Sequence, residues 1–204
     1  TYGAVDPWNW LNQLEGEMNS EDRDIVTLLI ENYVEPDHLK AIFDDVGLSD
    51  MMYVHEMNSD WPTLLDMINM DKRLVVFWEQ ASDSEHPYFH DFLTHSWTTN
   101  YADDDTASMD CEKLRGDVNQ PVFHMNNWLK NQAGLSDPTR AGEANDVDFM
   151  VERAIECIEL HGKRPTFIAV DWWEEGDVVE AVERVNQMEL DLSLIHISEP
   201  TRPV

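Results

Sequence analysis

Apolar residues occur in this chain with two spacings, as short unbroken runs and as positions that repeat every three or four residues. The unbroken runs are typical of strands buried on both faces of a sheet, and the repeats are typical of amphipathic helices. Strands are predicted at 25–30, 51–54, 73–77, 121–125 and 166–170, and helices begin near residues 7, 36, 60, 147 and 177. Residues 81–120 have no clear periodicity, which predicts a long loop with short helical pieces.

Polar residues follow the predicted strands at their carboxyl ends. They are Glu31 and Asn32, His55 and Glu56, Glu79 and Gln80, Asn126 and Asn127, and Asp171. In a parallel barrel these ends open onto one shared mouth, where active sites are built. Five strands do not close an eight-stranded barrel, so about three βα units are expected upstream. A doubly wound sheet fits less well, because no glycine-rich phosphate turn follows the first strand.

Several segments, in order along the chain, carry a resemblance to a known family. The segments are Asp24–Val34, Trp61–Leu64, Lys72–Phe77, Trp97 with Asn100 and Tyr101, Cys111 with Arg115, Met125 with Asn126, and Gly162–Asp171. The chain resembles the phosphatidylinositol-specific phospholipase C X-domain family, and more closely its PLC-like phosphodiesterases, over about residues 7–189. The resemblance implies an α/β fold that is an incomplete, distorted TIM barrel, with about five carboxyl-terminal βα units in residues 1–191.

The resemblance also implies a function, hydrolysis of a phosphoric diester of the phospholipase C type, on a phosphoinositide or a related phosphodiester. In that family one histidine acts as general base, another as general acid, and an arginine stabilises the developing charge. Histidine suits both tasks because it titrates near neutral pH. These groups lie on the early strands of the family fold, which precede this chain, so we expect the chain alone to be inactive.

One catalytic residue carries over from the resemblance. Asp171 matches the family aspartate that hydrogen-bonds the base histidine, where a carboxylate fixes the imidazole tautomer. The alternative is a loop or helix-start carboxylate. Glu31 aligns with a strand-end acid that lines the pocket, and pairing with a nearby cation is the alternative.

Aromatic and amide side chains supply the expected substrate contacts. Trp78 and Trp172, with Trp173, are candidates to stack on an inositol-like ring, and we expect at most one to do so, with packing as the alternative. Asn127, with Asn126, is a candidate to hydrogen-bond substrate hydroxyls, with loop capping as the equal alternative.

Further polar residues are assigned structural roles. Neither His55 nor His124 falls at a catalytic position of the family. A metal site is not favoured at His86, His90, Asp91 and His95, since no regular spacing on a helix supports one. Asp103–Asp105 lacks the ligand spacing of a calcium loop. No cofactor is therefore expected, and a requirement for calcium stays open without a motif to support it.

The composition is strongly acidic, with 42 Asp and Glu against 13 Lys and Arg and a net charge of −29. Such a surface repels phosphate backbones, so nucleic acid is excluded as a partner. No apolar run is long enough to span a bilayer. The expected partner is a small or lipid head-group phosphodiester, and the charge favours contact with a membrane surface only at high salt.

The two ends of the chain and its two cysteines bear on the origin of the sequence and on the compartment in which the protein is found. The chain has no initiator Met or leader at its start, so we expect it to be part of a longer, secreted protein whose signal peptide is not in this sequence. Residues 192–204 resemble translated read-through of a sequencing-library adaptor and are expected to be a non-native tail. Cys111 and Cys157 form either one disulfide or two free thiols, and spacing does not decide between them.

Two other functions remain from the sequence. A catalytically inactive barrel that binds a polyol or phosphate would keep the pocket and lack the upstream histidines. A glycoside hydrolase would use Glu31 and Asp171 as its carboxylate pair, and their separation would test it.

Overall fold

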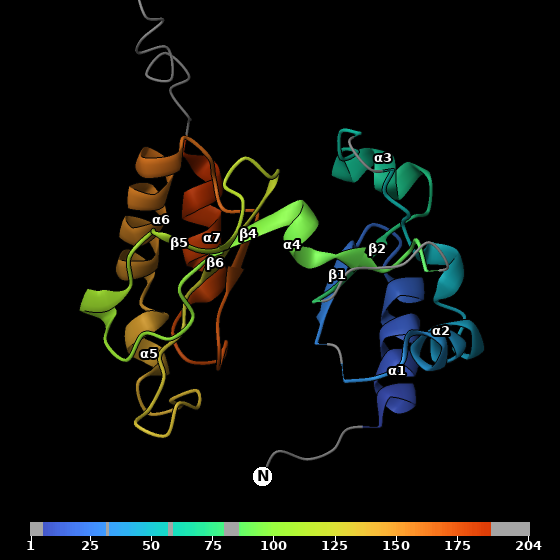
Figure 1. Cartoon of the computed structure of the whole chain (residues 1–204), viewed down its shortest axis with the longest axis horizontal. Helices are drawn as coiled ribbons and strands as arrows, with labels where there is room; N and C mark the ends of the chain where they lie inside the picture. The colour runs from blue at the N-terminus through green and yellow to red at the C-terminus, as the bar shows by residue number, and fades with distance from the viewer. Residues whose placement is uncertain (1–5, 32, 57–58, 80–85, 189–204) are drawn as a thin grey trace, which may run out of the picture. The chain divides into compact units, whose positions relative to one another are not determined.

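The computed structural model describes residues 6–31, 33–56, 59–79 and 86–188, which fall into two compact units that meet in sequence at His95 and Ser96 (Figure 1). The first unit contains a three-stranded parallel sheet, here called sheet A. Its strands are β1 (Val26–Ile30), β2 (Leu74–Trp78) and β3 (His90–Asp91), paired in that order. Its helices are α1 (Pro7–Ser20), α2 (Pro36–Asp45), the 3₁₀ turn η1 (Ser49–Met51), α3 (Leu64–Asn69) and α4 (Phe92–His95).

Local sequence explains where the helices of the first unit begin. Asp6 caps α1 through its side chain and Pro7 occupies the first helical position, where a missing N–H costs nothing. Thr63 and Asp66 form a reciprocal capping box at the start of α3. β2 is buried at every position, and the core of the unit forms around it from α1, α2 and β1. The buried guanidinium of Arg73 finds hydrogen-bond acceptors in this core. It donates to the backbone oxygens of Met18 (2.9 Å) and Glu21 (3.0 Å).

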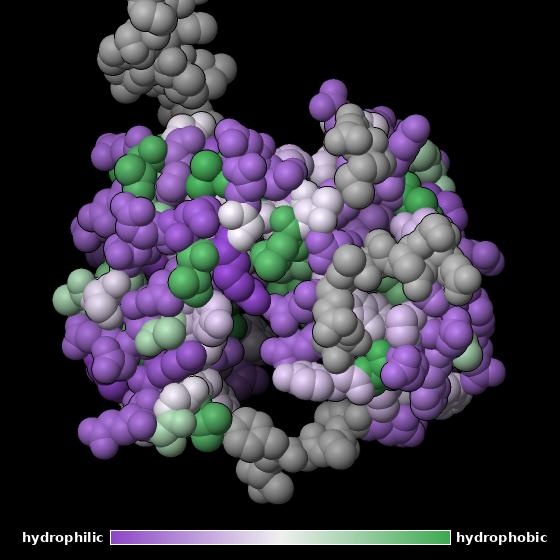
Figure 2. All heavy atoms as spheres, viewed as in Figure 1, coloured by the Kyte–Doolittle hydropathy of each residue, from purple (hydrophilic) through white to green (hydrophobic). Residues whose placement is uncertain are grey.

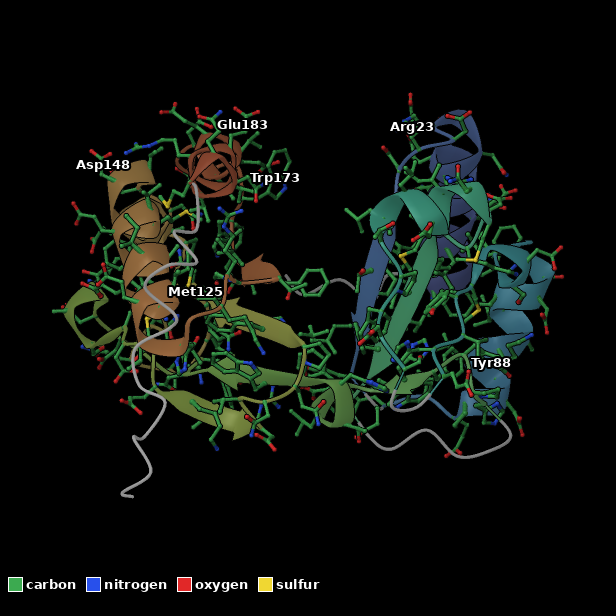
Figure 3. The ribbon with its side chains drawn as sticks, turned by 90° about the horizontal axis from the view of Figure 1, so that it is seen from above. Arg23, Tyr88, Met125, Asp148, Trp173 and Glu183 are labelled. Atoms are coloured by element: carbon green, nitrogen blue, oxygen red, sulfur yellow. A yellow bond between two sulfur atoms is a disulfide. The ribbon has the colours of Figure 1, made fainter. Side chains whose placement is uncertain are left out.

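The second unit contains a four-stranded mixed sheet, here called sheet B, in the order β5-β4-β6-β7. Its strands are β4 (Ser96–Thr99), β5 (Lys113–Gly116), β6 (Val122–Asn126) and β7 (Phe167–Ala169). Its helices are η2 (Thr106–Ser108), α5 (Ala141–Ala144), α6 (Val147–His161) and α7 (Val178–Gln187). β5 runs antiparallel to β4, and the other pairs are parallel. α6 and α7 lie side by side over the sheet, and Met125 of β6 points into the core beneath them (Figures 1 and 3).

A disulfide joins the two sides of the second core. Cys111, just before β5, is bonded to Cys157 of α6, and both are buried. Of the two states left open by the sequence, the disulfide is therefore the one observed. Nearby, the rings of Trp97 and Phe123 stack with centroids 3.8 Å apart in the centre of sheet B. Both side chains are fully buried, so this pair anchors β4 against β6.

The structure confirms a mixed α/β fold and corrects three details of the sequence prediction. Segment 51–54 contributes only an isolated parallel bridge between Met52 and Leu74. Residues 81–120 were predicted to be a loop, but they contain β3, β4 and β5; β4 alternates hydroxyl side chains with Trp97 and so lacks an apolar run. The described strands form two separate sheets, one of them with an antiparallel strand, and no closed barrel. Asn32, Gln80 and the tail at 192–204 lie outside the described residues.

The surface of each unit reflects the acidic composition. In Figure 2 hydrophilic residues cover most of the visible surface, with small apolar areas scattered between them. Among the described residues no helix is both long enough and apolar enough to cross a membrane.

Candidate functional site

The carboxyl ends of β6 and β7 are joined by their backbones. The N–H of Asn127, directly after β6, donates to the carbonyl of Ala169 at 2.7 Å. Asp171 follows two residues later and is half-buried. Asn145 fixes this turn, since its Nδ2 donates to the carbonyl oxygens of Asp171 (3.0 Å) and Trp172 (3.2 Å). The backbone of Asp171 is thus held in place, while its carboxylate forms no hydrogen bond to another described residue and is available to a partner.

The turn after β7 holds Trp172 in an uncommon conformation. Its φ of 54° is left-handed, which costs a non-glycine residue about 1–2 kcal/mol. Gly176 (φ 86°) lies so close to Asn145 that a Cβ would be 2.4 Å from that residue's carbonyl oxygen. The indole Nε1 of Trp172 donates to Oγ of Ser136 at 2.8 Å. Trp172 is 49% exposed and Trp173, labelled in Figure 3, is 66% exposed, so both rings offer surface to a ligand.

Asn126 and Asn127 belong to a buried network organised by Arg153 of α6. The guanidinium donates to the carbonyl oxygen of Asn126 (2.6 Å) and to Oδ1 of Asn127 (3.0 Å), and further bonds reach the carbonyls of Met109 and Asp110. Nδ2 of Asn127 donates to the carbonyl of Ala144 at 2.7 Å, and the residue is fully buried. Its amide is used within the protein, as in the loop-capping alternative for this side chain.

Burial of the Arg153 guanidinium disfavours its charged form. Desolvation lowers the pKa of Arg153 to about 10, against the opposing influence of Asp103. The same burial raises the pKa of Asp103, whose carboxylate accepts from Nδ2 of Asn100 at 2.7 Å. Sequence reasoning missed Arg153, since a single Arg in an amphipathic helix has no distinguishing pattern. Its role is to hold the ends of β4 and β6 in register.

A second cation missed by the sequence lies at the same edge of sheet B. Nζ of Lys130 is 4.9 Å from the ring centroid of Tyr101 and 5.6 Å from that of Trp128. The backbone N–H of Lys130 donates to the carbonyl of Asp103 at 2.8 Å, and Lys130 forms an isolated bridge with Ser136. Loops that follow β4, β6 and β7 therefore meet here, because Ser136 also accepts from Trp172. The signal in the sequence that could have indicated this contact is Lys130 shortly after Trp128, an aromatic residue that follows β6.

Two predicted residues, Glu31 and Trp78, belong to the first unit, whereas Asp171, Asn127 and Trp172 belong to the second. Glu31 follows β1 and is exposed. Trp78 is only 2% exposed and packs on Phe89 with ring centroids 4.9 Å apart. This placement matches the packing alternative for Trp78. Substrate contact by Glu31 stays a prediction.

The first unit holds a cluster of imidazoles beside sheet A. The ring of His55 stacks on that of Trp61 with centroids 4.0 Å apart. The ring centroids of His90 and His95 lie 6.5 Å and 5.3 Å from that of His55. Burial is the main cause that lowers the pKa of each of the three histidines, to about 4 for His90. Within the described part of the chain no group of three His, Cys, Asp or Glu could hold a metal ion.

His90 is fixed as one neutral tautomer. Its Nδ1 donates to the carbonyl of Val76 (3.0 Å), so its Nε2 accepts from the backbone N–H of His55 (3.0 Å). The N–H of Tyr53 donates directly to the carbonyl of Leu74, as in a parallel ladder. One step further, the His90 ring is inserted where the N–H of His55 would meet the carbonyl of Val76. The ring thus takes the place of a direct backbone hydrogen bond between His55 and β2.

A comparison with known proteins finds relatives that align with most of this chain. The PI-PLC X family model matches residues 3–186. A secreted protein and PI-PLC X domain-containing protein 1, both from Arthroderma benhamiae, are each 27% identical over 87% of the chain, which covers 45% and 64% of their lengths. A PI-PLC X domain-containing protein of Arabidopsis thaliana is 26% identical over 87% of the chain and 44% of its own length.

The chain spans about half the length of these curated relatives. No solved structure matches it. The family model, in contrast, covers nearly all of the described residues and both units. The resemblance read from Asp24–Val34 and Gly162–Asp171 is therefore confirmed, and the chain belongs to the PI-PLC X domain family.

Proposed function

We propose that this chain forms the carboxyl-terminal part of a PLC-like phosphodiesterase barrel, which hydrolyses a phosphoinositide or a related phosphodiester by general acid–base chemistry of histidines. The family match over residues 3–186 supports the reaction class. The observation that carries the role of this chain is Asp171, at the carboxyl end of β7, with a fixed backbone and a carboxylate without a hydrogen-bond partner among the described residues. The barrel, of which sheets A and B would be arcs, belongs to the same proposal.

In this proposal Asp171 is a positioning residue. It accepts a hydrogen bond from one nitrogen of an upstream histidine, so that the other nitrogen can take the proton of the attacking hydroxyl. It also stabilises the imidazolium that forms when this proton is transferred. The exposed ring of Trp172 offers an apolar face to the polyol of the head group. No cofactor is part of the mechanism.

The proposal is tested with the longer natural gene, assayed on a chromogenic inositol phosphodiester. Asp171→Asn should lower kcat by at least roughly a hundredfold and leave KM within about threefold, because the residue orients the base rather than holding the substrate. Asp148→Asn is the matched control, since this exposed carboxylate pairs with Arg184 on the helical side. Equal kcat for Asp171→Asn and the wild type would refute the role, and turnover by the 204-residue chain alone would show that the upstream histidines are unnecessary.

A second candidate function is a catalytically inactive module that binds a polyol or a phosphate. The specific observation in its favour is that Trp172 is exposed and held by Ser136 without any need for a catalytic group. Head-group binding by the longer protein without hydrolysis would select this function. We place either form outside the cytosol, because the Cys111–Cys157 disulfide persists in oxidising compartments and one relative is named a secreted protein.

A further inference from the structure

Segment 53–56 runs along the edge of β2 and is held there partly by a histidine side chain. Its backbone donates directly to the strand at Tyr53, whose N–H bonds to the carbonyl of Leu74 at 2.8 Å. The N–H of His55, two residues later, donates instead to Nε2 of His90 at 3.0 Å. The attachment of this segment therefore depends on a side chain that can take up a proton.

His90 cannot keep this contact once it is protonated. Its Nδ1 already donates to the carbonyl of Val76 at 3.0 Å, so a proton on Nε2 turns the acceptor for the His55 N–H into a second donor. Two N–H groups would then face each other, and the N–H of His55 would lose its partner. Proton uptake by His90 and the closed position of segment 53–56 therefore exclude each other.

Two further imidazoles lie beside this contact. The ring centroid of His95, in α4, is 5.3 Å from that of His55 and 5.8 Å from that of His90. Charges on any two of these rings would repel each other, and burial of His90 and His95 limits the screening of that repulsion by water. The other titratable groups that face the three rings are Tyr53, Glu56 and Asp91.

The three histidines resist protonation in the closed form. Burial is the main cause that lowers the pKa of each, to about 4 for His90, and the charges of Glu56 and Asp91 only partly oppose it at His55 and His95. A histidine in a hydrated, released segment takes up its proton near pH 6.5. Below that pH the released form binds more protons, so each extra proton favours release by up to about tenfold per pH unit.

We propose that His55, His90 and His95 form an acid-operated clasp, which holds segment 53–56 on β2 at neutral pH and releases it when the rings take up protons. The ring of Trp61, which stacks on His55, loses that contact on release. The change is local, so β1 and β2 stay paired in the released form. The clasp is a conformational device that goes beyond the proposed hydrolysis and does not depend on it.

The test follows amide hydrogen exchange of the 204-residue chain by NMR at pH 7.5 and pH 4.5, expressed as protection relative to the unfolded chain at the same pH. Protection of the His55 N–H should fall at least roughly tenfold at the lower pH. The N–H of Val26 in β1, which donates to the carbonyl of Arg73 at 2.9 Å, should then remain at least roughly tenfold better protected than that of His55. His38→Gln, at an exposed site on α2, is the matched control and should respond as the wild type does.

Two variants remove the titration of the clasp in different ways. His90→Gln supplies an amide oxygen that can accept from the N–H of His55 without titrating, so protection of that N–H should change less than about threefold between the two pH values. A double variant, His55→Phe with His95→Phe, keeps the rings but removes two protonation sites and their repulsion. It should reduce the acid response at residue 55 at least about threefold relative to the wild type.

Each result supports or overturns the clasp. Equal protection of the His55 N–H at the two pH values overturns it, and so does a wild-type response in both the His90→Gln and the double variant. If Val26 and His55 are equally protected at pH 4.5, the first unit unfolds as a whole and a local clasp is wrong. If His90→Gln leaves the N–H unprotected at both pH values, the double variant decides alone. Loss of protection at His55 that spares Val26 and is weakened in the double variant supports the proposal.

Discussion

Protonation of His90 should destabilise the first unit, because both ring nitrogens are committed to a neutral tautomer. Nδ1 donates to Val76 and Nε2 accepts from the N–H of His55, so an imidazolium would have to lose its contact with that N–H. The groups that face His90 are the rings of His55 and His95 and the side chains of Tyr53, Trp61 and Phe77. None of these carries a negative charge that would compensate the new proton.

The magnitude follows from the difference between the folded and unfolded pKa. Burial lowers the pKa of His90 from 6.5 to about 4, so the unfolded chain binds the proton more strongly throughout this interval. The free energy of unfolding should therefore fall as pH falls from about 6.5 to about 4, by up to roughly 1.4 kcal/mol per pH unit and about 3 kcal/mol in total. Above pH 6.5 the contribution is constant, since both states are neutral.

Urea unfolding of wild type and His90→Asn at several pH values isolates this contribution from the titration of the many carboxylates. At pH 7 the variant should be less stable by about 2–3 kcal/mol, because the N–H of His55 loses its acceptor and a cavity remains. Near pH 4 the two proteins should differ by less than about 1 kcal/mol. His38→Asn, at an exposed site on α2, is the control and should track the wild type at every pH. A stability difference between wild type and His90→Asn that is the same at pH 7 and pH 4.5 would refute the reasoning.

Three further predictions concern the second unit. Reduction of the Cys111–Cys157 disulfide, which spans 46 residues, should lower the free energy of unfolding by about 4 kcal/mol in urea titrations, and a double Cys→Ser variant should not respond to reductant. Arg153→Met should cost about 3–5 kcal/mol because it leaves buried acceptors without a donor, whereas Arg184→Met, at an exposed ion pair, should cost less than about 1 kcal/mol by the same measurement. Gly176→Ala should lower Tm more than Gly134→Ala. Both glycines have a positive φ, but only at Gly176 would the new Cβ meet a backbone oxygen, that of Asn145. Equal shifts of Tm would contradict the close approach of Gly176 to Asn145.

The secondary structure that the sequence predicted well is the part with strong local signals. The apolar run of β2 and the capped helices α1 and α6 were predicted close to their observed bounds, since burial and capping are both local in sequence. β4 was not predicted. Its residues Ser96, Thr98 and Thr99 are polar and buried, and such a strand is recognised only by its neighbours on the sheet.

Predictions at the candidate site had a similar limit. The sequence placed Asp171 at a strand end, because the strand before it is apolar and the family motif includes it. It could not distinguish Trp78, whose ring is in the core, from Trp172, whose ring is exposed, since both follow or end an apolar strand. That difference depends on which residues pack against the ring, such as Phe89 on Trp78, and these contacts are distant in sequence.

The few cations of the chain are more informative about function than its net charge. An acidic surface repels anions everywhere, so an anionic substrate can be held only where a cation is placed and kept from pairing with a carboxylate. Arg153 meets the second condition by donating to backbone carbonyls, but it is buried and holds loops together, and Arg73 is paired with the carboxylate of Asp71. Lys130 meets it with aromatic rings, since its ammonium lies against the rings of Tyr101 and Trp128. If the proposed phosphodiesterase activity holds, an anionic substrate has to be recognised through local contacts rather than through the overall charge, and added salt should weaken long-range repulsion more than it weakens the bound state.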